Sequence, residues 1–299
     1  MTTSVHELDL PEVELIDLDR DEAIALLSKV RDQHWLARTP VGYMATRHED
    51  VTAILRDKRF HSALSMITQM AGIPDDGGFM ERRRDSILSL EGEEHARLRR
   101  LVAGAFTPKS AERLRPFMRT VIGALVDEVA PTGRCELVED VCEPYPIPII
   151  CELLGAPKED WKLFSHWATD IFRIFNNDLL NDLPIIQAAS DELDEYVKAM
   201  VADRRSKPAD DLLSDLIAAE EAGDRLSTDE LVGLAEAVLM AGTDTTRNQL
   251  ACSVALFAQH PEQWQLLRER PVLAGRAVEE SMRYIGAVRG TARITAEDV

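Results

Sequence analysis

The chain has 299 residues, of which 45% are hydrophobic, and it carries a formal net charge of −19. This length suits one large domain or two ordinary ones, and the negative charge argues against nucleic acid as a partner. No apolar run reaches the roughly 18 residues that a membrane span needs. The four cysteines form no C-x-x-C pair, the seven histidines are scattered, and the chain start lacks a secretion signal. An intracellular, cytoplasmic protein without a zinc site is therefore expected.

The periodicity of apolar residues predicts a mainly α fold with a small β-sheet near the N-terminus. Residues 1–20 are expected to form an extended acidic arm, and residues 21–299 a single domain. The predicted elements are, in chain order, helix 21–31, strands 35–38 and 43–46 as a hairpin, helices 48–56, 93–106, 111–129, 147–154, 160–175, 191–205, 209–221, 227–260, 261–268 and 273–284, and strand 291–294.

Two segments between these elements have an unusual composition. Residues 61–90 mix methionine with glycine and proline, which predicts a long irregular segment. Long loops in compact domains are often functional, and a surface loop without function is the alternative. Residues 172–186 form an apolar stretch with a short polar interruption. This stretch either covers a pocket or packs in the core.

The segment Ser227–His260 is the one around which the chain is expected to be organised. Ser227 and Glu230 have the spacing of a capping box, so a helix should begin there. About 32 residues at roughly 1.5 Å each span about 48 Å, enough to cross a whole domain. The centre, Ala241-Gly242-Thr243-Asp244-Thr245-Thr246, is polar and rich in poor helix formers. It predicts a local opening where a ligand approaches the backbone; a polar patch on a half-exposed helix is the alternative.

Charged residues suggest two further features. The helix predicted over 93–106 is basic, and His95 and Arg99 lie four residues apart, so both can reach the same anion. A solvated charged face is the usual alternative. In the last helix Glu280 and Arg283 are three residues apart. An exposed pair of this kind contributes less than about 1 kcal/mol.

The order and separation of these segments resemble the cytochrome P-450 family, the haem-thiolate monooxygenases, and in particular its soluble bacterial members. The resemblance runs from about Asp21 to Val299. The segments that carry it are His95-Ala96-Arg97-Leu98-Arg99-Arg100-Leu101-Val102 with Ala105-Phe106-Thr107-Pro108, Pro146-Ile147-Pro148-Ile149-Ile150-Cys151-Glu152-Leu153-Leu154-Gly155, Ala241-Gly242-Thr243-Asp244-Thr245-Thr246, Glu280-Ser281-Met282-Arg283, and Gly290-Thr291-Ala292-Arg293.

The resemblance implies a haem b cofactor, with O2 as co-substrate, held around a long central helix. The implied site residues are the cofactor contacts His95, Arg99, Ala241, Gly242, Thr245 and Arg293, the catalytic pair Asp244 and Thr245, and the structural pair Glu280 and Arg283. His95, Arg99 and Arg293 would bind the haem propionates. Gly242 would let the helix backbone pass close over the haem. Asp244 and Thr245 would deliver protons during oxygen activation.

The implied function is insertion of one oxygen atom from O2 into a small apolar substrate, of the terpenoid, steroid, fatty-acid or polyketide class. Electrons would come from NAD(P)H through a ferredoxin reductase and a ferredoxin. Arg97 and Arg100 would receive the acidic ferredoxin. The protein is expected to be a monomer without nucleic-acid or membrane partners. Two other classes stay open: a haem-free remnant or binding scaffold, and an unrelated acidic helical protein.

In this family the cysteine that ligates iron lies in a glycine-rich loop beyond the E-x-x-R helix, and the given sequence reaches no such loop. The cysteines present are Cys135, Cys142, Cys151 and Cys252. The last two fall within predicted helices and the first two lie far upstream, so no metal ligand is assigned. The chain is therefore expected to be the N-terminal part of a monooxygenase, cut short at Val299 and inactive alone.

Overall fold

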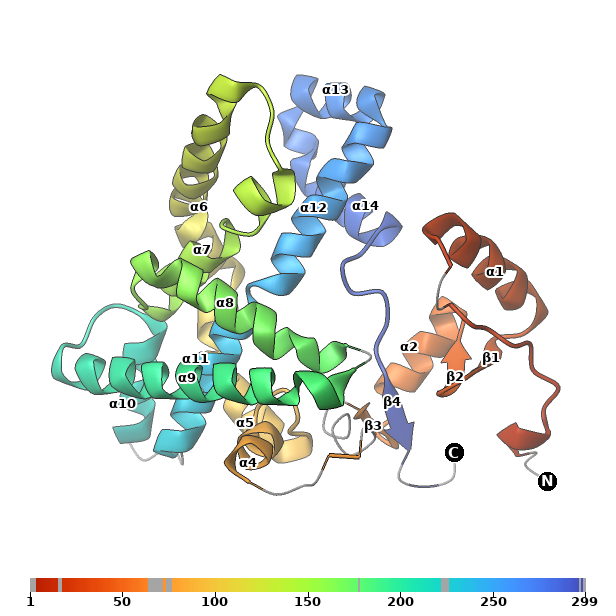
Figure 1. Cartoon of the computed structure of the whole chain (residues 1–299), viewed down its shortest axis with the longest axis horizontal. Helices are drawn as coiled ribbons and strands as arrows, with labels where there is room; N and C mark the ends of the chain where they lie inside the picture. The colour runs from red at the N-terminus through yellow and green to blue at the C-terminus, as the bar shows by residue number, and fades with distance from the viewer. Residues whose placement is uncertain are drawn as a thin grey trace. The chain divides into compact units, whose positions relative to one another are not determined.

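The computed structural model describes residues 4–15, 18–63, 72–73, 77–176, 178–221, 226–295 and 297. Residues 1–61 and 293–299 form one compact unit, and residues 62–292 form a larger one. Helices make up most of the described chain and the strands are few and short, so the predicted mainly α class is confirmed (Figure 1). The predicted arm and single domain, 1–20 and 21–299, stay predictions.

The smaller unit is built from two helices and short strands. Its elements are α1 (Arg20–Gln33), β1 (Leu36–Thr39), β2 (Gly42–Ala45), α2 (His48–Arg56), β3 (Phe60–Ser62, whose last residue belongs to the larger unit) and β4 (Arg293–Thr295). A capping box between Asp19 and Glu22 begins α1. β1 and β2 pair antiparallel, which confirms the predicted hairpin. The pairing of β3 with β4 was not predicted.

The larger unit consists of helices. They are α4 (Gly78–Asp85), α5 (Gly92–Ala103), α6 (Pro108–Val129), α7 (Pro146–Leu154), α8 (Trp161–Ile171), α9 (Leu179–Ser206), α10 (Leu212–Glu221), α11 (Thr228–Ala241), α12 (Asp244–Gln259), α13 (Pro261–Glu269) and α14 (Ala274–Tyr284). Short 3-10 turns adjoin several of them, and a π-helical turn, η5, spans Val138–Cys142. Most predicted helices are confirmed, with ends shifted by a few residues.

Two predictions about this unit need correction. Helix α4 lies within the segment predicted to be irregular, of which residues 64–71 and 74–76 are outside the described residues. Helix α9 begins at Leu179, although the prediction began it at residue 191. The reason is tertiary: Leu179 and Ile186 are buried against Phe79 of α4, and this packing extends the helix through Pro184. The apolar stretch 172–186 therefore contributes to the core.

The core of the larger unit surrounds α11. Leu231, Leu234 and Ala235 are at most 2% exposed and belong to a cluster shared with α7, α9 and α10. Figure 1 shows α11 and α12 following one another through the larger unit. In contrast to α11, α12 has no buried residue along its described length. Among the described residues, no helix combines the length and apolar content needed to cross a lipid bilayer.

Candidate active site

The predicted long helix is interrupted at its polar centre. Helix α11 ends at Ala241 and α12 begins at Asp244. In the interruption, the hydroxyl of Thr243 donates to the carbonyl of Met240 (2.8 Å), and in the first turn of α12 the hydroxyl of Thr245 donates to the carbonyl of Ala241 (3.3 Å). Threonine hydroxyls that bond nearby carbonyls compete with the backbone ladder of a helix. The predicted local opening is therefore confirmed, and its cause lies in the motif itself.

The interruption also marks a change in exposure along the central helix. Val238 and Leu239 are buried, whereas Ala241 and Thr245, one turn apart, are exposed. Between them Thr243 points inward and is only 6% exposed. The exposed side of the helix, called the open face, thus carries the small side chains of Ala241 and Thr245, and neither of them is bulky. Such a face fits a flat macrocycle such as haem, which needs close approach over a broad area.

Gly242 faces a neighbouring helix. A Cβ atom built at Gly242 would lie 2.2 Å from both Cγ1 and Cδ1 of Ile150 on α7. The missing side chain therefore lets α7 pack closely against the interruption. This gives Gly242 a packing role, and its predicted contact with haem stays a prediction.

Substitution of Gly242 by alanine is expected to lower the free energy of unfolding by about 1–3 kcal/mol, the usual range for overpacking. Combined with Ile150→Ala, the same substitution should become neutral or stabilising, because alanine favours a helix over glycine by about 1 kcal/mol. Gly233→Ala on α11 is the matched control, since a Cβ there meets no atom within 4 Å. Urea denaturation gives the free energy of unfolding of the wild-type protein, Gly242→Ala, Ile150→Ala, the double variant and Gly233→Ala. An equal effect of Gly242→Ala with and without Ile150 would contradict the packing role.

Asp244, the acid of the motif, is held by its own helix. Its carboxylate accepts hydrogen bonds from the Arg247 guanidinium and from Nδ2 of Asn248, the latter at 3.0 Å. The Asp244 side chain remains 26% exposed. It is thus a partly exposed carboxylate that adjoins Thr245 in the chain.

The predicted anion-binding residues lie on α5 and β4. Leu98 and Val102 anchor α5 in the core, which leaves His95 half-buried and Arg99 exposed. Among the described residues, neither side chain has a hydrogen-bond or ion-pair partner, so both are available to an anion. Arg293 is half-buried at the start of β4, in the smaller unit. Its convergence with His95 and Arg99 on one cofactor stays a prediction.

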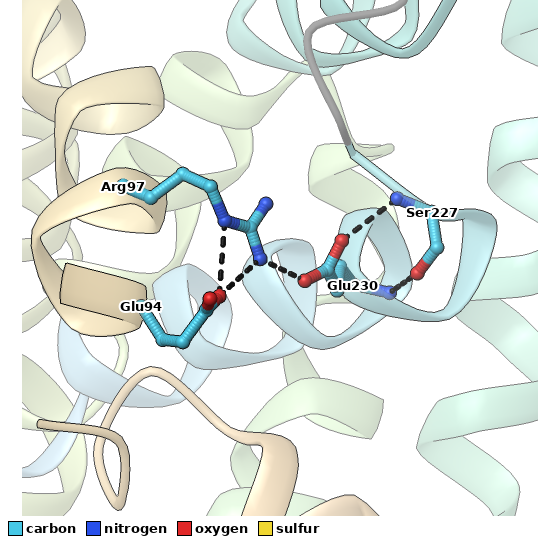
Figure 2. A network of polar contacts seen from close by, with 4 residues as sticks. All are labelled: Glu94, Arg97, Ser227 and Glu230. Carbon is cyan, nitrogen blue, oxygen red and sulfur yellow. Dashed lines mark hydrogen bonds and ion pairs between the residues drawn. The ribbon is translucent and has the colours of Figure 1, made fainter.

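Arg97 differs from its neighbours on α5 because it bonds within the chain. Figure 2 shows its guanidinium between Glu94 of the same helix, at 2.9 Å, and Glu230 in the first turn of α11. The other oxygen of Glu230 accepts the backbone N–H of Ser227 at 2.8 Å, completing the capping box. Burial raises the pKa of Glu230, but hydrogen bonds from Arg97 and Ser227 outweigh it, and the net pKa lies below its ordinary value. Arg97 thus braces α5 against α11, and its predicted role in receiving a ferredoxin stays a prediction.

Glu236 is a residue that sequence reasoning missed. It lies on α11 and faces α9 and α4, and its Oε1 atom is buried without a hydrogen-bond partner among the described residues. Burial, reinforced by the nearby charge of Asp194, raises the pKa of Glu236 to about 7. The sequence feature that could have identified Glu236 is an acidic residue within the apolar run that precedes residues 241–246.

Glu280 and Arg283 form an ion pair on α14 at 2.7 Å, and both side chains are more than half exposed. Glu280 also lines a cavity of about 490 Å³ between α12, α13 and α14, and none of the predicted catalytic or cofactor residues line this cavity. The structural role predicted for the pair beneath the haem stays a prediction.

A cysteine ligates iron well only as a thiolate, so burial of a thiol weakens it as an iron ligand. Cys142 and Cys151 are fully buried, and burial raises the pKa of Cys151 to about 12 and that of Cys142 above its ordinary value. Both thiols therefore stay protonated at neutral pH. No group of three or more potential metal-ligating side chains occurs within the described parts of the chain.

The chain of residues 1–299, supplied with haem, is accordingly expected to lack the red-shifted Soret band of a thiolate-ligated carbon monoxide complex. The reduced protein is exposed to carbon monoxide and its absorption spectrum is recorded. Cys151→Ser should leave the spectrum unchanged. A red-shifted band that disappears on substitution of one of the four cysteines would show that the named thiol binds iron.

Comparisons with known proteins show which family this chain resembles over most of its length. The family model described as cytochrome P-450 matches residues 40–283. Luteothin monooxygenase of Streptomyces thioluteus is 33% identical over 306 residues, covering 100% of this chain and 74% of that protein. A polyketide biosynthesis cytochrome P-450, PksS of Bacillus subtilis, is 32% identical, covering 82% of this chain and 60% of that protein. The crystal structure of CalO2 superposes with a TM-score of 0.85 at 28% identity, covering 93% of this chain and 70% of that one. The chain thus spans roughly two thirds of the length of its relatives.

Proposed function

Because the chain belongs to the cytochrome P-450 family of oxidoreductases, we propose that it supplies the oxygen-activating side of a haem-dependent monooxygenase. The reaction inserts one atom of O2 into a small apolar organic substrate, with electrons from NAD(P)H delivered through a ferredoxin. The observation that carries the proposal is the interruption between α11 and α12. It presents the Thr245 hydroxyl and the small Ala241 on an open helix face, with Asp244 next to Thr245 in the chain. The family match excludes an unrelated helical protein.

Haem, when bound, supplies an iron centre that binds and reduces O2. The residues of this chain would hold and serve it. Arg99 is exposed and His95 half-buried on one face of α5, and both can donate charge-assisted hydrogen bonds to the propionates. Ala241 leaves room for close approach to the helix.

Proton delivery is the role of Thr245 and Asp244. The Thr245 hydroxyl already donates its proton to the Ala241 carbonyl, so its oxygen lone pairs can accept a hydrogen bond from water at the open face. Asp244 can take up a proton and release it towards that water, which is general acid–base catalysis. Monooxygenation consumes protons. The supply of protons through Asp244 and Thr245 therefore decides whether reduced oxygen is used to form product.

The substrate proposal is an apolar natural product of the terpenoid, steroid, fatty-acid or polyketide class. PksS is named for polyketide biosynthesis, which supports the polyketide class. Arg100 is exposed on α5 and remains a candidate docking residue for an acidic ferredoxin. The cytoplasmic location and the monomeric state stay predictions.

The test uses the product of the full coding sequence, and it begins with reading that sequence on both sides of residues 1–299. The reconstituted protein is supplied with haem, NAD(P)H, ferredoxin, ferredoxin reductase and a panel of apolar substrates under ¹⁸O2. One ¹⁸O atom in the product is expected. A protein that binds haem and accepts electrons but never incorporates ¹⁸O would contradict the proposal, and failure to bind haem would support a haem-free scaffold instead.

A further inference from the structure

A chain of polar groups leads from Asp244 to the loop between η5 and α7. The Arg247 guanidinium bonds Asp244 through Nη2, while its Nη1 lies 4.0 Å from Oε1 of Glu143. The same Glu143 oxygen accepts a hydrogen bond from the Ser165 hydroxyl on α8, at 2.6 Å. Glu143 is 32% exposed, whereas Ser165 is buried. Glu143, the more exposed carboxylate, therefore lies at one end of this polar chain, and the proposed catalytic acid Asp244, 26% exposed, lies at the other.

A small cavity lies among these groups. It is lined by Glu143, Ile147, Ser165, Ala168, Thr243, Asp244 and Arg247, and its volume is about 10 Å³. A volume of roughly 10–15 Å³ with two to four polar partners is what one water molecule requires. The Glu143 and Asp244 carboxylates provide two such partners, while the Ser165 hydroxyl is donated to Glu143. Ile147 and Ala168 provide the apolar wall, which leaves no space for a second water.

We propose that this cavity binds one water molecule that relays protons from Glu143 to Asp244, with Glu143 as the entry point from solvent. The inference rests on the proposed monooxygenase function. Protonated Glu143 gives its proton to the water, and the same water gives one of its own protons to Asp244. The water is unchanged, Glu143 becomes a carboxylate that solvent can reprotonate, and one proton has moved inward.

Arg247 positions the two carboxylates for this transfer. Its guanidinium is 23% exposed and lies between Asp244 and Glu143, so it offsets the repulsion that two nearby carboxylates would otherwise experience. The competing explanation is a structural brace that joins the η5 loop, α8 and α12 without moving protons. The two explanations predict different changes in rate and solvent isotope effect when the acid or the water is removed.

The first experiment removes the acid. In the complete enzyme, Glu143→Gln keeps the shape and the Ser165 hydrogen bond but cannot release a proton. We expect the rate of product formation to fall about 10-fold, less than the roughly 10²–10⁴ attributed to a direct general acid, with a larger solvent deuterium isotope effect. Glu139→Gln, an exposed acid on η5, is the matched control and should change neither quantity. Ser165→Ala removes the brace but keeps the acid, and should leave the isotope effect at its wild-type value.

The second experiment needs no activity. A high-resolution crystal structure of the complete protein should show one ordered water within hydrogen-bond distance of Glu143 and Asp244. Ala168→Val should displace it and reproduce the isotope effect of Glu143→Gln. The relay is overturned if the water is absent, or if Glu143→Gln and Ser165→Ala have the same effect on rate and isotope effect, as a brace requires. If no substrate is oxygenated at all, the function proposal fails, and the crystallographic water still decides whether the site exists.

Discussion

Thr245→Ala in the complete enzyme is expected to lower the product formed per NAD(P)H consumed about 10-fold, at the lower end of general acid–base effects. The lost electrons should appear as hydrogen peroxide. The reason is that the hydroxyl acts on proton delivery and not on ground-state binding, so kcat for product falls while substrate affinity hardly changes. The fold should tolerate the change, because the hydroxyl is exposed and makes one 3.3 Å hydrogen bond to the Ala241 carbonyl of its own helix.

The measurement is the ratio of product to peroxide at matched NAD(P)H consumption. Thr246→Ala is the matched control, since Thr246 is also exposed and adjacent in the chain. Thr245→Ser keeps the hydroxyl and should restore most of the product yield. A yield in Thr245→Ala equal to that of the unmodified enzyme would show that this hydroxyl takes no part in proton delivery.

The free energy of unfolding is expected to vary by about 3 kcal/mol between pH 4 and pH 8 because of Glu236, and Glu236→Gln should remove this variation. Burial raises the pKa of Glu236 from 4.5 in the unfolded chain to about 7 in the folded one. Between these two values the folded state binds more protons than the unfolded state. The contribution of Glu236 is therefore fully present below pH 4.5 and is lost as the pH rises through 7.

Urea denaturation of both proteins across this pH range measures the effect. The charged neighbours Asp194, Arg82 and Lys198 are present in both proteins, so their own contributions cancel in the comparison. Asp229→Asn is the matched control, because Asp229 is exposed in the first turn of the same helix. If the free energy of unfolding depended on pH in the same way in the wild-type protein and in Glu236→Gln, the raised pKa of the buried Glu236 would be contradicted.

Local sequence determined much of the fold around the site. The capping box of Ser227 and Glu230 begins α11 where it was predicted, because both hydrogen bonds join residues three apart. The interruption at Gly242 and Thr243 follows from glycine and from threonine hydroxyls that bond carbonyls three or four residues back. The resemblance placed Asp244 and Thr245 at this interruption. Interactions of such short range depend on neighbouring residues alone.

Only the tertiary structure decided which distant groups meet. Arg97 looked like a surface cation, and the fold brings it to Glu230, 133 residues away, which makes it a brace. The same holds for Glu143 beside Arg247, and for Ile150 in the space that Gly242 leaves. The protonation of Glu236 depends on burial against α9, which the periodicity of α11 does not encode. Helix signals act over three or four residues, whereas ion-pair partners and desolvation depend on how the helices pack.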